Sequence, residues 1–166
     1  MLIKVTKLTD ETILRAACEA TMRGQQSKVS LDKMYRCEHS PIRTQLFWIE
    51  MKDIYTFVSV HLVRHKTGVE HYIMSNREDR GGTGKEDRYT PINHSMFINA
   101  QALIQMSRKR LCGAAHHEAR NVMQAIKDEI EKVDPALARY MVRECEYRGF
   151  RCHELKSCGY LATIRK

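Results

Sequence analysis

Two long stretches with helical spacing of apolar residues dominate the second half of the chain. They cover residues 91–110 and 116–133, and Pro135 ends the second stretch because proline cannot continue a helix. Helices of this length need another layer on which to bury their apolar side. Residues 44–51 are rich in β-branched and aromatic side chains, which indicates a strand. We therefore expect an α/β (α+β) fold, with a small, mainly antiparallel sheet backed by long helices.

Shorter elements are predicted around these two helices. We expect strands over residues 1–7 and 70–74, and helices over residues 10–21, 31–37, 54–64 and 136–142, with Asp10 and Asp53 as N-caps. Residues 67–90 contain four glycines and few apolar side chains after Met74, which indicates a long functional loop. The 166 residues fit a single domain, residues 1–166, whose cysteine-rich C-terminal tail starts at about residue 144.

The sequence predicts neither a membrane span nor a signal peptide. Its longest apolar stretch, residues 54–63, is interrupted by Tyr, Thr, Ser and His, and a span needs roughly 20 apolar residues. The N-terminal residues alternate as in a strand and lack the apolar segment of a signal peptide. We therefore expect a cytoplasmic protein without a membrane partner, whose cysteines are reduced.

A formal net charge of +8 indicates either a solvated basic surface or an anionic partner. The arginines do not form one run, because they occur singly or in pairs beside apolar helical stretches. Arginine suits bidentate contacts with phosphate. Scattered arginines therefore favour separate phosphate pockets over a continuous nucleic-acid surface.

The segment from His61 to Arg77 carries the most specific pattern. Arg64, His65 and Lys66 end a predicted helix, where the helix dipole favours cations, and the following polar loop returns with Ser75 and Arg77. Such a cluster can hold phosphate groups. The alternative is that these side chains only cap the helix and add surface charge.

This segment resembles the signature of the flavin-dependent thymidylate synthases (ThyX), in which Arg-His-Arg is followed after a short spacer by Ser-x-Arg. The chain has Arg64-His65-Lys66, eight residues, and then Ser75-Asn76-Arg77. A second block is similar to a helix pair of the same family, in matching positions that include Asn99, Ala100, Leu103, Arg110, Glu118 and Arg120. Together the blocks identify the chain as a short, divergent member of the kind expected from a phage.

The resemblance implies a homotetramer with active sites at subunit interfaces, which converts dUMP to dTMP. Methylenetetrahydrofolate would supply the carbon, reduced FAD the hydride, and NADPH the electrons that reduce the flavin. By position, FAD would be bound by Arg64, His65 and Lys66. By the same comparison, dUMP would be bound by His61, Ser75, Arg77 and Arg110. Arg110 is the expected catalytic residue, because its charge beside the pyrimidine would stabilise electron density on the ring.

Two alternatives stay open, because Lys66 and Gln101 stand where the family has arginines. The chain could modify another deoxyuridine nucleotide. It could instead be a non-catalytic protein that binds nucleotides or nucleic acid.

The cysteines of the tail suggest a metal site. Cys145, Cys152 and Cys158, completed by Cys112 or Cys37, could bind zinc or an iron–sulfur cluster. The alternative is a set of unlinked thiols in a packed tail, since the spacing is not that of a close Cys pair. His71 and His94 are isolated in the sequence, and we expect them to be polar surface or loop residues.

Overall fold

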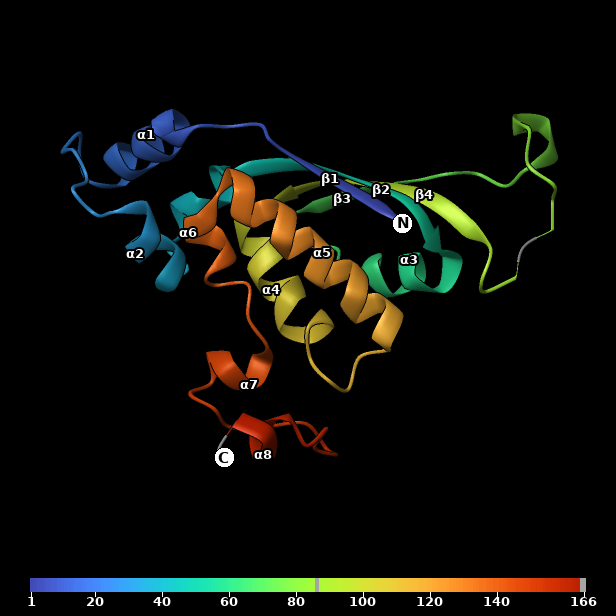
Figure 1. Ribbon diagram of the computed structural model, residues 1–166. Helices are drawn as coiled ribbons and strands as arrows, with labels where there is room; N and C mark the ends of the chain where they lie inside the picture. Colours follow the sequence, from blue (N-terminus) through green and yellow to red (C-terminus); the bar gives the residue numbers. More distant parts are fainter. Residues whose placement is uncertain (86, 165–166) are drawn as a thin grey trace.

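A computed structural model describes residues 1–85 and 87–164. Four antiparallel strands form one sheet in the order β1-β2-β4-β3. Their bounds are β1 Leu2–Lys7, β2 Leu46–Tyr55, β3 Val69–Ile73 and β4 Pro91–Asn99. Figure 1 shows the long helices α4 (Ala100–Arg110) and α5 (His117–Val133) packed against one face of this sheet. The predicted fold class, a small antiparallel sheet backed by helices, is confirmed.

The predicted helix over residues 91–110 is wrong in its first half. Residues 91–99 form β4, in which every second side chain is buried: Ile92, His94, Met96 and Ile98. This period of two places these four side chains on the inner face of the sheet. Strand β4 itself lies between β2 and β3. Helix α4 begins only after Asn99, whose side chain accepts a hydrogen bond from Ala102 N at 2.9 Å.

Strand β2 is longer than predicted, and helix α3 (Thr56–Leu62) is shorter. The register of β2 against β4 shifts between Met51 and Ile54, so both side chains stay buried on the same face. Asp53 lies in this irregular segment with φ +56°, and it is not the predicted N-cap of α3. Tyr55 occupies the N-cap position without a capping side-chain hydrogen bond. A 3-10 helix, η1 (Ser40–Thr44), precedes the strand.

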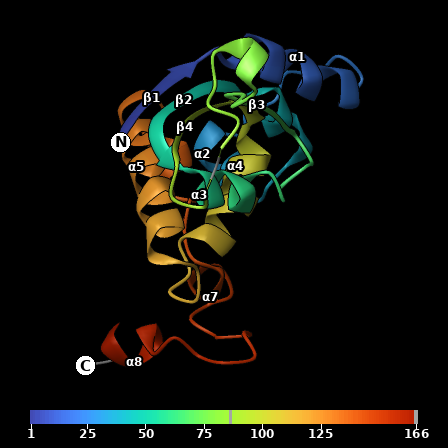
Figure 2. The same ribbon diagram turned by 90° about the vertical axis from the view of Figure 1, so that its right-hand side faces the viewer.

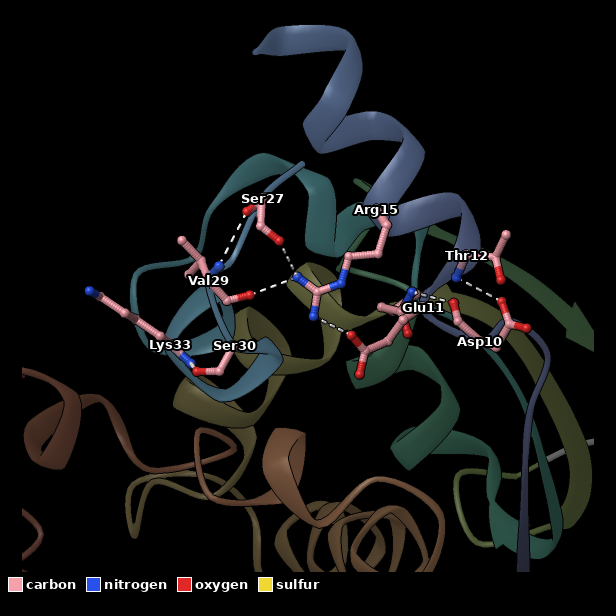
Figure 3. A network of polar contacts seen from close by, with 9 residues as sticks. Asp10, Glu11, Thr12, Arg15, Ser27, Val29, Ser30 and Lys33 are labelled. Atoms are coloured by element: carbon pink, nitrogen blue, oxygen red, sulfur yellow. Dashed lines mark hydrogen bonds and ion pairs between the residues drawn. The ribbon is translucent and has the colours of Figure 1, made fainter. Parts of the chain in front are cut away.

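The N-terminal helices agree with the sequence prediction. Helix α1 (Glu11–Thr21) is capped by Asp10, which accepts a hydrogen bond from Thr12 N at 2.9 Å, and α2 covers Leu31–Arg36. Arg15 holds the connection between them, because its guanidinium donates to Val29 O at 2.7 Å (Figure 3). The connection is therefore fixed by main-chain acceptors and does not depend on apolar contacts alone.

Asp134 joins β1 and α2 to α6 (Pro135–Ala138). Its buried carboxylate accepts hydrogen bonds from Lys7 Nζ and Tyr35 Oη, both at 2.8 Å, and caps α6 through Leu137 N at 3.0 Å. Helix α6 is shorter than the predicted 136–142 because the chain turns away after Ala138.

The tail contains two short helices, α7 (Glu144–Tyr147) and α8 (Tyr160–Ile164), with irregular chain between them. Figures 1 and 2 place this tail beyond the end of α4, away from the sheet. In its described residues, 74–85 and 87–90, the long connection between β3 and β4 contains one short 3-10 helix, η2 (Glu78–Arg80). Within residues 1–85 and 87–164, we find no helix with the length and apolarity needed to cross a bilayer.

Candidate nucleotide and cofactor site

The turn after α3 carries Arg64, His65 and Lys66, and it is fixed against the start of α4. His65 N donates to Leu62 O at 3.0 Å, which ends the helix. Gly68 follows with φ +74°, and its carbonyl accepts from Asn99 N at 3.0 Å. A side-chain carbon at Gly68 would lie 2.5 Å from Nδ2 of Asn99, so this close approach requires glycine.

Arg110 reaches the same turn from the other side. It ends α4, whose last turn carries three basic residues, where the helix dipole favours positive charge. Its Nε donates to Nε2 of His65 at 3.0 Å, and its Nη1 lies 3.5 Å from Nδ1 of His61. The structure therefore brings Arg110 to His61 and His65, although Arg110 lies 49 and 45 positions after them in the sequence.

His61 and His65 both have a lowered pKa beside the positive charge of Arg110. Burial, followed by the charge of Arg110, lowers the pKa of His65 to about 4. Burial and the charges of Arg110 and Arg64 also lower the pKa of His61. Both imidazoles are therefore neutral near pH 7, and His65 offers a free lone pair to Arg110.

The described acidic side chains do not pair with the cations of this cluster. Among residues 1–85 and 87–164, no carboxylate forms an ion pair with Arg64, Lys66 or Arg110. Burial, followed by the nearby charge of Arg64, lowers the pKa of Arg110. Cations gathered without counter-charges favour an anionic ligand.

A shallow cavity of about 230 Å³ opens beside the cluster. It is lined by Arg64, His65, Lys66, Thr67, Ala102 and Gln105. Guanidinium, ammonium, hydroxyl and amide groups are all donors to phosphate oxygens, so these residues fit the diphosphate of a dinucleotide cofactor such as FAD. Thr67 and Gln105 were not predicted from the sequence, since neither belongs to a recognisable motif.

Ser75 and Arg77 do not join the cluster within one chain. Arg77 is exposed and makes a bidentate ion pair with Asp79, with both N–O distances 2.8 Å. Ser75 Oγ accepts from Arg77 N at 3.3 Å. Both residues lie in the connection from β3 to β4, which extends beyond the sheet in Figure 1. Their predicted contact with dUMP stays a prediction that concerns an assembly of several chains.

Gln101 and Arg108, both on α4, form a second polar cluster with Glu38. Both side chains contact the carboxylate of Glu38, and Arg108 also stacks over Tyr147, with its guanidinium carbon 3.5 Å from the ring centroid. Gln101 is buried. These contacts attach the segment after α2 and the start of the tail to α4, and they lie outside the cavity at Arg64.

The prediction for His94 is wrong, because its ring is buried inside the fold, whereas His71 is half-buried and lies in β3, not in a loop. His94 is completely buried, and its Nε2 lies 3.0 Å from Nδ1 of His71. The alternation of Ile92, His94, Met96 and Ile98 is the signal that would have placed His94 on the inner face of a strand.

Four cysteines gather around one small pocket at the tail. Cys112, from the end of α4, lines it together with Cys145, Cys152 and Cys158. Burial is the main cause that raises the pKa of the Cys112 and Cys145 thiols. The described part of the chain nevertheless contains no group of three or more His, Cys, Asp or Glu side chains arranged to hold a metal ion. The metal site predicted from the sequence is thus not formed in this structure.

Comparisons of sequence find no relative of this chain. No family model matches the sequence, and no curated protein matches it.

Comparison of structures, in contrast, finds close similarity of fold. The flavin-dependent thymidylate synthase ThyX from Helicobacter pylori, complexed with FAD and dUMP, superposes with a TM-score of 0.70 at 12% identity, over 86% of this chain and 100% of the other. A second structure of the Helicobacter pylori enzyme with FAD and dUMP gives 0.64 at 14% identity, over 87% and 99%. The UMP/dUMP methylase PolB from Streptomyces cacaoi, bound with 5-Br dUMP, gives 0.63 at 13% identity, over 84% and 94%. The chain therefore has a divergent ThyX-like fold.

Proposed function

We propose that this chain is a flavin-dependent nucleotide methyltransferase that converts dUMP to dTMP. The observation that carries the proposal is the cluster of Arg64, Lys66 and Arg110, which forms no ion pair with an acidic side chain in the described part of the chain. Arg64 and Lys66 also line a polar cavity. It occurs on a ThyX-like fold, and solved structures with that fold include enzymes complexed with FAD and dUMP. Sequence signature, fold and charge thus agree on one class of ligand.

Arg64, His65 and Lys66 would hold the phosphates of FAD, because they line the polar cavity. Bound FAD, reduced by NADPH, would supply the hydride, and methylenetetrahydrofolate would be the carbon donor. Lys66 gives a point charge where an arginine would give two parallel hydrogen bonds, so its share of the phosphate contact is smaller.

Arg110 would bind dUMP and act as the catalytic residue. Its Nε donates to His65 and its Nη1 lies 3.5 Å from Nδ1 of His61, so the remaining N–H groups of the terminal nitrogens would contact a ligand. A fixed positive charge beside the pyrimidine stabilises the negative charge that develops on the ring during reaction. His61, neutral because of burial and the neighbouring guanidiniums, would add a hydrogen bond to the nucleotide.

The active site would be completed by assembly of a homotetramer. Within one chain, Ser75 and Arg77 lie apart from Arg110, while the sequence signature assigns all three to dUMP. A site at a subunit interface reconciles the two observations, because a neighbouring copy would supply Ser75 and Arg77.

A second candidate substrate is a different uridine nucleotide. The fold similarity to a UMP/dUMP methylase favours this alternative, since that protein shares as much of the fold as the second thymidylate synthase structure. The two candidates differ in substrate and share the cavity, the cluster and the flavin.

Ligand binding separates these enzymes from a non-catalytic binding protein. The purified protein should be yellow or take up added FAD with a visible flavin band, and it should bind dUMP. Arg64→Gln should weaken FAD binding about ten-fold or more. The control is Arg23→Gln, which removes the same charge from an exposed loop. A colourless protein that ignores FAD and dUMP but shifts labelled DNA or RNA would contradict the proposal.

A further inference from the structure

A chain of hydrogen bonds runs from the protein core to the turn that carries the cation cluster. Ser59 Oγ lies 3.0 Å from Nδ1 of His94, and His94 Nε2 lies 3.0 Å from Nδ1 of His71. His71 Nε2 lies 2.9 Å from the main-chain carbonyl of His65. The three side chains come from α3, β4 and β3, so these hydrogen bonds link three elements of the fold to the turn.

The carbonyl of His65 fixes which atom donates in each of these hydrogen bonds. A carbonyl oxygen only accepts, so His71 must carry its proton on Nε2. The Nδ1 atom of a neutral His71 then accepts from Nε2–H of His94. Nδ1 of His94 in turn accepts from the hydroxyl of Ser59. With neutral rings, a single arrangement of protons satisfies all three hydrogen bonds.

Burial makes this arrangement rigid. Ser59 and His94 are 2% and 0% exposed, so solvent does not replace a lost partner at the core end. A buried polar group without a partner is costly, and this cost keeps the two rings in one tautomer and one orientation.

This series of hydrogen bonds ends at His65, the residue that orients Arg110. His65 is held at its carbonyl by His71 and at its ring by Arg110, whose Nε donates to Nε2 of His65 at 3.0 Å. The same ring must carry its own proton on Nδ1, the opposite tautomer from His71 and His94. A change at His71 would therefore move the ring on which Arg110 rests.

We propose that His71 and His94 are positioning residues that fix His65 and, through it, the guanidinium of Arg110. The proposal rests on the function proposed above, in which Arg110 contacts the nucleotide. His71 and His94 act through His65, and neither lines the cavity at Arg64.

Two substitutions at His71 test its hydrogen bond to the carbonyl of His65. Both remove the imidazole ring, but only one of them also removes the N–H donor. His71→Leu removes the donor to the His65 carbonyl, whereas His71→Gln places an amide N–H near the position of Nε2. We expect His71→Leu to weaken dUMP binding about ten-fold and His71→Gln to stay within about three-fold of the unaltered protein. Equal dUMP affinity in His71→Leu and the unaltered protein would overturn the proposal.

Nitrogen-15 NMR of the histidine rings gives a readout that does not require nucleotide binding. The expected spectrum has protons on Nε2 of His71 and His94 and on Nδ1 of His65, and the Arg110 Nε–H signal should shift in His71→Leu. The opposite tautomer at His71, or an unchanged Arg110 signal in that variant, would contradict the proposal.

The NMR result also separates the two proposals. If the unaltered protein binds no dUMP, the proposed function fails, and the tautomers and the Arg110 signal still decide the positioning role. Should His71→Leu not fold, Ser59→Ala replaces it, because this change removes one donor and leaves both rings in place. A shift of the Arg110 signal in Ser59→Ala supports the proposal, and an unchanged signal contradicts it.

Discussion

Arg110 donates from Nε to Nε2 of His65 at 3.0 Å, across the junction between the end of α4 and the turn after α3. This contact joins the two sequence blocks that resemble one family, although 45 residues separate the partners. It also limits which atoms of Arg110 can contact a ligand, because Nε already donates to His65.

The first prediction concerns the chemistry of this guanidinium. Arg110→Ala should weaken dUMP binding at least about ten-fold and abolish turnover, because it removes both the charge and the contact with His65. Arg110→Lys should fall between, since lysine keeps the charge and lacks the planar set of donors. Calorimetric titration with dUMP measures both variants, with Arg23→Gln as the control. Unchanged affinity and rate in Arg110→Ala would refute the role assigned to it.

The fold could be predicted in outline because its main signals are local. Asp10 and the apolar spacing of α1 mark a helix, and Pro135 marks the end of α5. Strand β4 was missed because Pro91 and the neighbouring helix suggested one long helical stretch, and the alternation from Ile92 to Ile98 carried the contrary signal. The bulge at Asp53 has no local signal, since it depends on pairing with β4.

The candidate site could be predicted only in part, for a related reason. Residues in a short motif, such as Arg64 and His65, are visible from their order in the chain. The contact of His71 with His94 depends on the pairing of β3 with β4, which brings together residues that have no common motif. Sequence reasoning also did not separate contacts within one chain from contacts between copies, as Arg77 shows.

The second prediction addresses this separation. If Arg77 serves the site of a neighbouring chain, Arg77→Ala and Arg110→Ala should each be inactive alone and should recover part of the activity when co-expressed. Mixed assemblies then contain some sites in which both arginines are intact. The measurement is turnover of the co-purified mixture, together with its mass in solution. A monomeric protein, or a mixture as inactive as its parents, would exclude the shared site.

The third prediction is a pH dependence of stability. Burial, followed by the charge of His71, lowers the pKa of His94 from its ordinary 6.5 to about 4. Between these values the unfolded chain binds a proton that the folded chain does not, so stability falls as the pH falls through this window. Lowering the pH from 6.5 to 5 should cost about 1.6 kcal/mol at this residue.

Urea unfolding at both pH values measures the effect. His65, with a pKa also lowered to about 4, adds a smaller share because it is partly exposed. His94→Leu should be less stable at pH 7.5 and should lose part of the slope between the two pH values. A slope equal to that of the unaltered protein would show that His94 does not titrate in this way.

The fourth prediction concerns the thiols at the tail. Cys37 and Cys152 are exposed, whereas Cys112 is buried and burial raises its pKa, so iodoacetamide at pH 7.5 should modify Cys112 after Cys37 and Cys152. Peptide mass analysis over time gives the order.

The same experiment tests the metal site predicted from the sequence. If Cys112, Cys145, Cys152 and Cys158 close on zinc, added zinc should slow the alkylation of these four thiols and leave Cys37 unaffected. Equal rates with and without zinc would contradict a metal at the tail.

The most direct measurement of the central claim is the mass of the product. The protein is incubated with dUMP, methylenetetrahydrofolate, FAD and NADPH, and the nucleotide is identified by mass spectrometry. The account predicts dTMP from the unaltered protein and from Arg23→Gln, and none from Arg110→Ala. Unmodified dUMP in every sample, with the flavin bound and reduced, would contradict the claim that this cluster holds a nucleotide for methylation.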